Sequence, residues 1–120
     1  MNATRSSDFD RTKIRFAELL KALAHPERLA ILGILSEREE CMCENISNKL
    51  PLTQSTVSQH LKVLKEAGLI HGKITGVSVC YDLNPETFRE CCSLFDGFAE
   101  KMLSGKKVQF GVKDQSLGSS

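Results

Sequence analysis

The sequence contains no apolar run of about eighteen residues, the length at which a segment becomes a candidate membrane-spanning helix. Its first seven residues also lack the apolar core of a secretory signal peptide. It has no Cys-x-x-Cys motif of the kind found in thiol oxidoreductases, no glycine-rich phosphate loop and no defensible pair of catalytic carboxylates. We therefore expect a cytoplasmic protein that has no membrane partner and is not an enzyme.

A large net charge is also missing, because 16 Lys and Arg against 15 Asp and Glu leave +1. A monomeric nucleic-acid-binding protein is often clearly basic, so this balance alone argues against DNA binding. The charges are unevenly distributed, however: residues 47–83 contain lysines at positions 49, 62, 65 and 73, but their only acids are Glu66 and Asp82. This distribution predicts a basic surface on a nearly neutral protein.

Length and composition indicate one globular domain. A chain of 120 residues with 41% hydrophobic and 26% charged residues can bury a core unaided. We expect a mobile arm at residues 1–7, one domain at 8–103 and a disordered tail at 104–120, where no hydrophobic period survives.

The first half of the domain has a helical hydrophobic period. A first helix is expected from Asp8 and should end at His25, because the residue before a proline disfavours helical geometry. A second helix is expected at 26–36, with Leu29, Leu32 and Leu35 on one side and Ile31 and Ile34 widening the apolar arc. An arc this wide is typical of a helix buried in the core.

The stretch from Leu52 to Leu69 has two distinct helical faces. Thr53 is a candidate N-cap and Gly68 a candidate C-terminal cap. One side of the helix carries the apolar stripe Val57, Leu61 and Leu64. The other side carries Ser55, Gln59, Lys62 and Glu66. Such a helix can attach to a core by one side and present polar groups to the major groove of DNA with the other.

A short helical segment at 44–50 and the turn Pro51-Leu52-Thr53 precede this stretch, which is the arrangement of a helix-turn-helix. An ordinary corner between two helices is the alternative. The short turn and the polar face favour DNA binding, and the candidate DNA-contacting residues are Thr53, Gln54, Ser55, Thr56, Ser58, Gln59, His60, Lys62 and Lys73.

Residues 69–83 alternate in polarity around Thr75-Gly76, which predicts a β-hairpin directly after the helix, in the position of a wing. Lys73 and His71 lie where a wing reaches phosphate, although solvated strand residues are nearly as good an interpretation.

Asn84 and Pro85 predict the start of a last helix that runs to about Leu103. One side of it carries large apolar groups, more than a small winged domain needs to cover its own core: Phe88, Cys92, Phe95, Phe98, Ala99 and Met102. We expect this stripe, together with the first helix, to pair with a second copy of the chain. The alternative is that this stripe only covers the core of its own domain.

The predicted fold is mainly α with a small β-hairpin wing, a winged helix-turn-helix that is dimeric through its first and last helices. Two segments, 20–32 (LKALAHPERLAIL) and 54–69 (QSTVSQHLKVLKEAGL), resemble the ArsR/SmtB-type winged-helix repressors of bacteria. The wing, from Gly76 to Leu83, agrees with this resemblance. The resemblance implies a homodimeric repressor that binds double-stranded operator DNA and leaves it when an inducer binds.

Many members of that family sense metals or metalloids through cysteines, which directs attention to Cys41, Cys43, Cys80, Cys91 and Cys92. Thiolates bind soft ions, and Cys41 and Cys43 should share one side of an extended segment. A trigonal arsenic(III) site needs three thiolates and a zinc site four ligands, so Cys80 or the Cys91-Cys92 pair would have to join them.

The sequence departs from the family pattern at these cysteines. Arsenic-sensing members place their Cys-x-Cys one residue later, and residues 85–103 contain no histidine that could serve as a ligand. In a winged fold the Cys41–Cys43 segment can pair with the second wing strand, which brings Cys80 near. We expect Val79, Tyr81 and Leu83 to point inward, however, which turns Cys80 the other way. A soft-metal or arsenic(III) sensor, a redox or persulfide switch, and buried cysteines without a sensing role all remain open, as does a winged helix used only for protein contacts.

Overall fold

The computed structural model describes residues 10–105. The predicted arm at 1–7 and residues 106–120 of the predicted tail lie outside this range. Five helices and two strands follow in the order α1 Arg11–Leu23, α2 Pro26–Ser36, α3 Cys43–Asn48, α4 Gln54–Glu66, β1 Ile70–Thr75, β2 Ser78–Leu83 and α5 Pro85–Ser104. This is the mainly helical fold with a β-hairpin that the sequence predicts.

Four helices begin at a side-chain cap; at the start of α2, His25 Nδ1 accepts a hydrogen bond from the Glu27 amide at 3.2 Å. The Thr53 side chain accepts a hydrogen bond from the Thr56 amide, and the Asn84 side chain accepts one from the Glu86 amide. Both caps were predicted. The first helix was expected from Asp8, which lies outside the described residues; α1 begins at Arg11, where the Asp10 carboxylate accepts from the Thr12 amide at 2.8 Å.

Helix α2 lies in the core, with Ile31, Leu32, Ile34 and Leu35 buried. The prediction was wrong for Leu29, which is 54% exposed. Its side chain lies about 160° around the helix from Ile31, because successive residues turn by about 100°. The buried arc is therefore wide, but it is centred on Ile31 and Leu35 and ends before Leu29.

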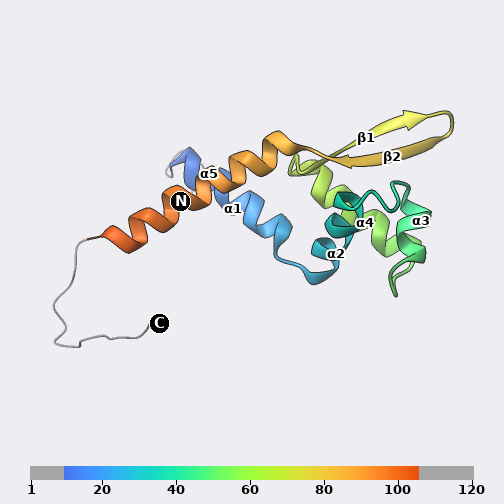
Figure 1. The fold of residues 1–120 in the computed structure, drawn as a ribbon, viewed down its shortest axis with the longest axis horizontal. Helices are drawn as coiled ribbons and strands as arrows, with labels where there is room; N and C mark the ends of the chain where they lie inside the picture. The colour runs from blue at the N-terminus through green and yellow to red at the C-terminus, as the bar shows by residue number, and fades with distance from the viewer. Residues whose placement is uncertain (1–9, 106–120) are drawn as a thin grey trace, which may run out of the picture.

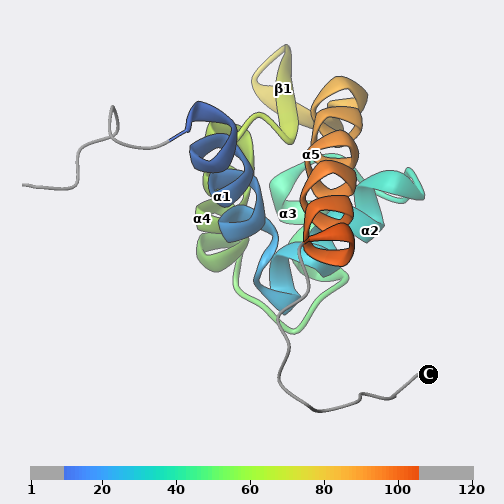
Figure 2. The same ribbon diagram turned by 90° about the vertical axis from the view of Figure 1, so that its left-hand side faces the viewer.

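Figure 1 shows the arrangement of the elements along the molecule. The antiparallel hairpin of β1 and β2 projects at one end, with Ile70 opposite Leu83 and Thr75 opposite Ser78. Helix α5 extends from the end of the hairpin toward the other side and crosses α1, which it contacts (Figures 1 and 2). Within residues 10–105, no helix is both long and apolar enough to cross a membrane.

The turn between α4 and β1 depends on Gly68, whose φ of +85° lies in the left-handed region. Its amide donates to the Lys65 carbonyl at 2.9 Å, and the Leu69 amide donates to the Leu64 carbonyl at 3.0 Å. These bonds satisfy carbonyls at the end of α4 and direct the chain into the hairpin. Glycine adopts this backbone conformation without the steric cost that a Cβ atom adds.

Gly68→Ala should therefore destabilise the protein by about 1–2 kcal/mol through backbone strain. Gly33→Ala is the matched control, because Gly33 lies inside α2 with no atom within 4 Å of an added Cβ. The control should be neutral or stabilising by up to about 1 kcal/mol. Urea unfolding of both variants measures the two effects, and changes of the same sign would contradict this account.

Candidate nucleic-acid interface and cysteine sites

Helix α4 is buried on one side and exposed on the other. Val57, Leu61 and Leu64 are 0–1% exposed and pack in the central hydrophobic cluster, as predicted. Full burial of one such side chain contributes about 1.5–3 kcal/mol. The opposite side of α4 stays in solvent because its residues are polar.

Most of the predicted DNA-contacting residues lie on that solvent side. The exposed ones are Thr53, Gln54, Ser55, Ser58, Gln59 and Lys62 on or before α4, and Lys73 on β1. Thr56 is half-buried, and its hydroxyl accepts a hydrogen bond from the Thr53 hydroxyl at 3.0 Å. The exposed groups form one polar surface, which we call the α4 face: Thr53, Gln54, Ser55, Ser58, Gln59 and Lys62.

Helix α3 precedes the turn and packs against α4. It runs from Cys43 to Asn48, one residue earlier at its start and two shorter at its end than the predicted 44–50. Ile46 is fully buried and belongs to the same hydrophobic cluster as α4, and α3 and α4 are in contact. The two helices with their short turn form the predicted helix-turn-helix.

His60 was a candidate DNA contact, but it is only 8% exposed and bonds inward. Its Nε2 lies 2.8 Å from a Glu27 carboxylate oxygen, and its Nδ1 lies 3.2 Å from the Arg28 guanidinium. Because a guanidinium only donates, Nδ1 accepts and the Nε2–H donates to Glu27. Arg28 also donates to the Ala22 carbonyl at 2.6 Å, so His60 joins α4 to the junction of α1 and α2.

His25, Glu27 and His60 form the only group of three potential metal ligands in the described residues, with ligand atoms within 4.8 Å of one another. A metal on His60 Nε2 would require the proton on Nδ1. That proton would face the N–H groups of Arg28 at 3.2 Å. The group therefore fits a hydrogen-bond network that positions α4 better than it fits a metal site.

The hairpin presents Lys73 and His71 to solvent, on β1. Val77, at the turn, is also fully exposed. Lys73 is thus exposed to solvent on the strand that directly follows α4.

The five cysteines do not come together in one site. Cys43 lies in α3 and its thiol donates to the Gln54 carbonyl at 3.5 Å, whereas Cys41 lies in the preceding loop. The expectation that both occupy one side of an extended segment was wrong, because the helix begins between them. Burial raises the pKa of the Cys43 thiol, and burial is also the main cause that raises the pKa of Cys91. Cys92 is exposed on α5.

Cys41 and Cys80 form a disulfide, with their Cα atoms 4.8 Å apart. The expected approach of the Cys41–Cys43 segment to the second wing strand is observed, but the expectation that Cys80 turns away from Cys41 was wrong. The Tyr81 amide donates to the Cys41 carbonyl at 2.8 Å, so the loop before α3 meets the edge of β2 at this residue. Tyr81 and Leu83 do pack against the core, whereas Cys80, which lies between Val79 and Tyr81 in the alternation of β2, is joined to Cys41 by the disulfide, and neither cysteine belongs to the core cluster.

Comparison with known proteins identifies the same regions. A helix-turn-helix domain family matches residues 23–73. The HTH-type transcriptional repressor SmtB of Mycobacterium tuberculosis is 47% identical over 66 residues, which cover 55% of this chain and 48% of that protein, so the chain matches about half of its length. The arsenical resistance operon repressor of Bacillus subtilis is 36% identical over 87 residues, covering 68% of this chain and 82% of the repressor.

A solved structure has a similar fold. The homodimeric winged helix-turn-helix DNA-binding domain of a Mycobacterium bovis protein, described as a possible ArsR-family regulator, superposes with a TM-score of 0.62 and 25% identity. The superposition covers 91% of this chain and 99% of that domain.

Proposed function

We propose that this chain, which belongs to the ArsR/SmtB-type family of winged helix-turn-helix transcriptional regulators, is a homodimeric repressor of transcription. It binds double-stranded operator DNA in the cytoplasm and leaves the DNA in response to an inducer. The observation that carries this proposal is the α4 face, which combines amides, hydroxyls and a lysine on a helix whose other side is buried.

The side chains of the α4 face suit a major groove. Gln59 can bond an adenine edge in two places, and Ser55 can bond a base or a phosphate. Lys62 and Lys73 supply positive charge for the DNA backbone. The N-terminus of α4 adds free amide donors that favour phosphate. Burial of His60 removes it from this set, and its role is to hold α4 at a fixed angle.

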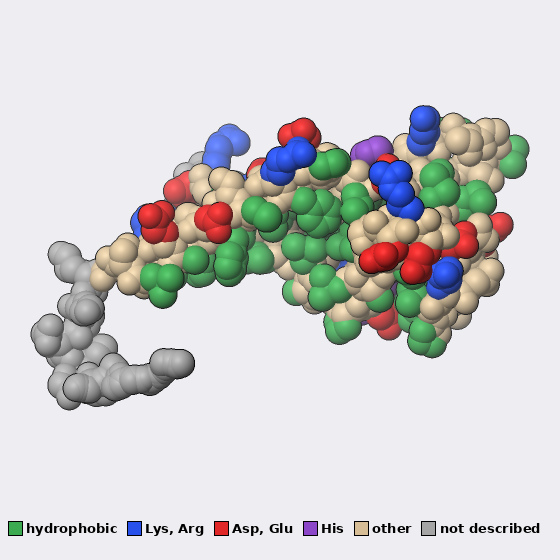
Figure 3. Space-filling model, in the orientation of Figure 1, with side chains coloured by type: hydrophobic (Ala, Val, Ile, Leu, Met, Phe, Trp, Pro, Cys, Tyr) green, Lys and Arg blue, Asp and Glu red, His purple; other side chains and the backbone are tan. Residues whose placement is uncertain are grey.

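The dimer surface is proposed on α5 and α1. Phe95, Phe98 and Met102 are 52%, 48% and 59% exposed. Phe16 of α1 lies beneath them, with its ring centroid 6.1 Å from Phe95 and 5.6 Å from Phe98. Figure 3 shows hydrophobic side chains along the extended part of α5. Apolar area of this extent favours a second copy, which would place two α4 faces on successive turns of DNA.

A second candidate function is a repressor that responds to thiol oxidation, and the Cys41–Cys80 disulfide favours it. The disulfide joins the wing to the loop before α3, so its formation can change the relative position of the two parts that approach DNA. A three-thiolate site for arsenic(III) or another soft metal finds less support, because Cys43 bonds elsewhere and Cys91 and Cys92 lie on α5.

Substitutions on the α4 face test DNA binding. Lys62→Ala should weaken binding to all duplexes and lower the slope of log affinity against log salt by about one unit, because one DNA phosphate is no longer neutralised. Gln59→Ala should instead reduce discrimination at one base pair per half-site by about 1–3 kcal/mol. Fluorescence anisotropy on duplexes selected by the wild-type protein measures both effects.

Lys101→Ala, in the last turn of α5, removes the same charge and should leave both quantities unchanged. If the wild-type protein selects no duplex, or binds without salt dependence, the domain is used for protein contacts only.

Phe98→Asp tests the dimer surface, because it places a charge inside the proposed apolar contact. It should convert the dimer to a monomer in sedimentation experiments and reduce DNA affinity. Ser93→Asp adds the same charge to an exposed position off the apolar stripe and should remain dimeric. A wild-type monomer, or dissociation of both variants alike, would contradict the proposed surface.

The redox candidate predicts that operator affinity differs between the disulfide and dithiol forms. The difference should disappear in Cys41→Ser and in Cys80→Ser and persist in Cys92→Ser. Anisotropy titrations of each form, with the redox state verified by alkylation and mass spectrometry, test it. Equal affinity in both forms of the wild-type protein would exclude this regulation and leave the repressor function standing.

A further inference from the structure

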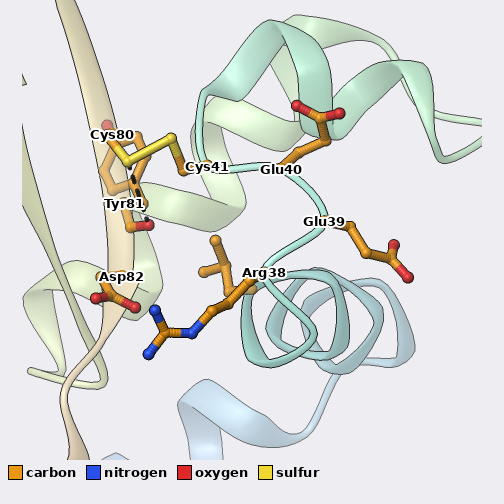
Figure 4. A pocket seen from close by; sticks show the side chains of 8 residues that line it. Arg38, Glu39, Glu40, Cys41, Cys80, Tyr81 and Asp82 are labelled. Carbon is orange, nitrogen blue, oxygen red and sulfur yellow. Dashed lines mark hydrogen bonds between the residues drawn. A yellow bond between two sulfur atoms is a disulfide. The ribbon is translucent and has the colours of Figure 1, made fainter.

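A pocket of about 330 Å³ lies beside the Cys41–Cys80 disulfide, and both cysteines line it (Figure 4). The volume is at the lower end of the range for small-molecule sites, about 300–1,000 Å³. Besides the two cysteines, Tyr81 and Leu35 supply apolar lining, and the other lining residues are charged. A disulfide at the wall of an open pocket is accessible to a small reactant.

The pocket contains a cation and an anion on one side. Figure 4 shows the Arg38 guanidinium extending toward the side where Asp82 lies, whereas Glu39 and Glu40 turn away. Glu39 pairs instead with Lys49 at 3.6 Å. Within residues 10–105, no carboxylate lies within 4.0 Å of the Arg38 guanidinium, so its charge is available to a ligand.

The backbone at the end of α2 determines where Arg38 lies. Its φ is +58°, the only positive value among non-glycine residues in the described range. Its amide donates to the Leu35 carbonyl and the Glu39 amide to the Ile34 carbonyl, both at 3.1 Å, which closes the helix in a position where glycine is usual. An arginine at this position carries a steric cost that glycine would avoid, and backbone strain of this kind is concentrated at functional sites.

We propose that this pocket binds a small zwitterionic thiol, with a carboxylate of the thiol beside Arg38 and its ammonium beside Asp82, and that the bound thiol exchanges with the Cys41–Cys80 disulfide. Neutral thiols lack both charges, so neither Arg38 nor Asp82 orients them beside the disulfide. The site differs from the α4 face and from the dimer surface in all of its residues.

The exchange balances without a further reactant. The thiolate of the small molecule attacks one sulfur of the disulfide, which forms a mixed disulfide and releases the other cysteine as a thiolate that takes up a proton. A second small thiol attacks the mixed disulfide, forms the small-molecule disulfide and releases the second cysteine as a thiol. The reverse sequence, started by the small-molecule disulfide, restores the Cys41–Cys80 bond.

Exchange changes how the wing is attached. The covalent link between β2 and the loop before α3 opens, while the hydrogen bond from the Tyr81 amide to the Cys41 carbonyl can remain. The site would thereby respond to the ratio of small thiol to its disulfide. The reaction is measured on the free protein without DNA, so its outcome is independent of the proposed repressor function.

The test measures the rate at which oxidised protein loses its disulfide, in the Cys92→Ser background so that the exposed Cys92 does not react. Glutathione, which carries one ammonium and two carboxylates, is the charged probe, and 2-mercaptoethanol is the neutral one. Arg38→Gln should slow the reaction with glutathione by about two- to five-fold, the effect of one exposed charge pair, and leave the reaction with 2-mercaptoethanol unchanged. The difference should vanish at about 1 M salt, where surface charges are screened.

Two control variants separate recognition from conformation. Arg38→Lys keeps the charge and should retain most of the glutathione rate, and Lys65→Gln removes an exposed charge on α4 and should have no effect. With Cys80→Ser, glutathione disulfide should leave one glutathione on Cys41, detected by peptide mass. Equal slowing of both thiols by Arg38→Gln, no slowing of either, or absence of the Cys41–Cys80 bond in oxidised protein would overturn the proposal.

Discussion

The attachment of α4 to the core is the constraint on which the rest of the structure depends. Val57, Leu61 and Leu64 are removed from water, and His60 is held between Glu27 and Arg28. The apolar contacts provide most of the stabilisation, because burial is roughly proportional to area, but they are not directional. The hydrogen bonds of His60 are directional, and they fix the orientation of α4 relative to α2. A helix fixed in this way can present an unpaired polar face to DNA without losing its position.

The same domain leaves a second apolar face uncovered. Among the described residues of α5, only Thr87 is buried, although the helix carries Phe95, Phe98 and Met102. The first half of α5 meets the core through Phe88, Cys91 and Leu94, and farther along Phe16 of α1, 8% exposed, contacts Phe95 and Phe98. A second copy would therefore continue the packing of the first instead of forming a separate core, which explains how dimerisation can fix the distance between two α4 faces.

The wing and the helix-turn-helix meet at the edge of β2. There the backbone bond between Tyr81 and Cys41 and the disulfide between Cys41 and Cys80 join the loop before α3 to the hairpin. Pairing at this edge removes one exposed strand edge from a small sheet. It also places the disulfide between the two parts of the proposed DNA surface, next to Arg38 and its pocket. The disulfide thus lies close to the hairpin and to the helix-turn-helix, the two parts of the proposed DNA surface.

Local sequence determined the helices, the caps at Thr53 and Asn84, the glycine at the end of α4 and the hairpin, because each depends on period, capping or φ within a few residues. It also determined which side of α4 is buried. Tertiary structure alone decided that Leu29 is exposed, that His60 faces inward and that Cys41 meets Cys80. Those outcomes depend on which segments pack side by side, at separations such as the 39 residues between the two cysteines, and no local period contains that information.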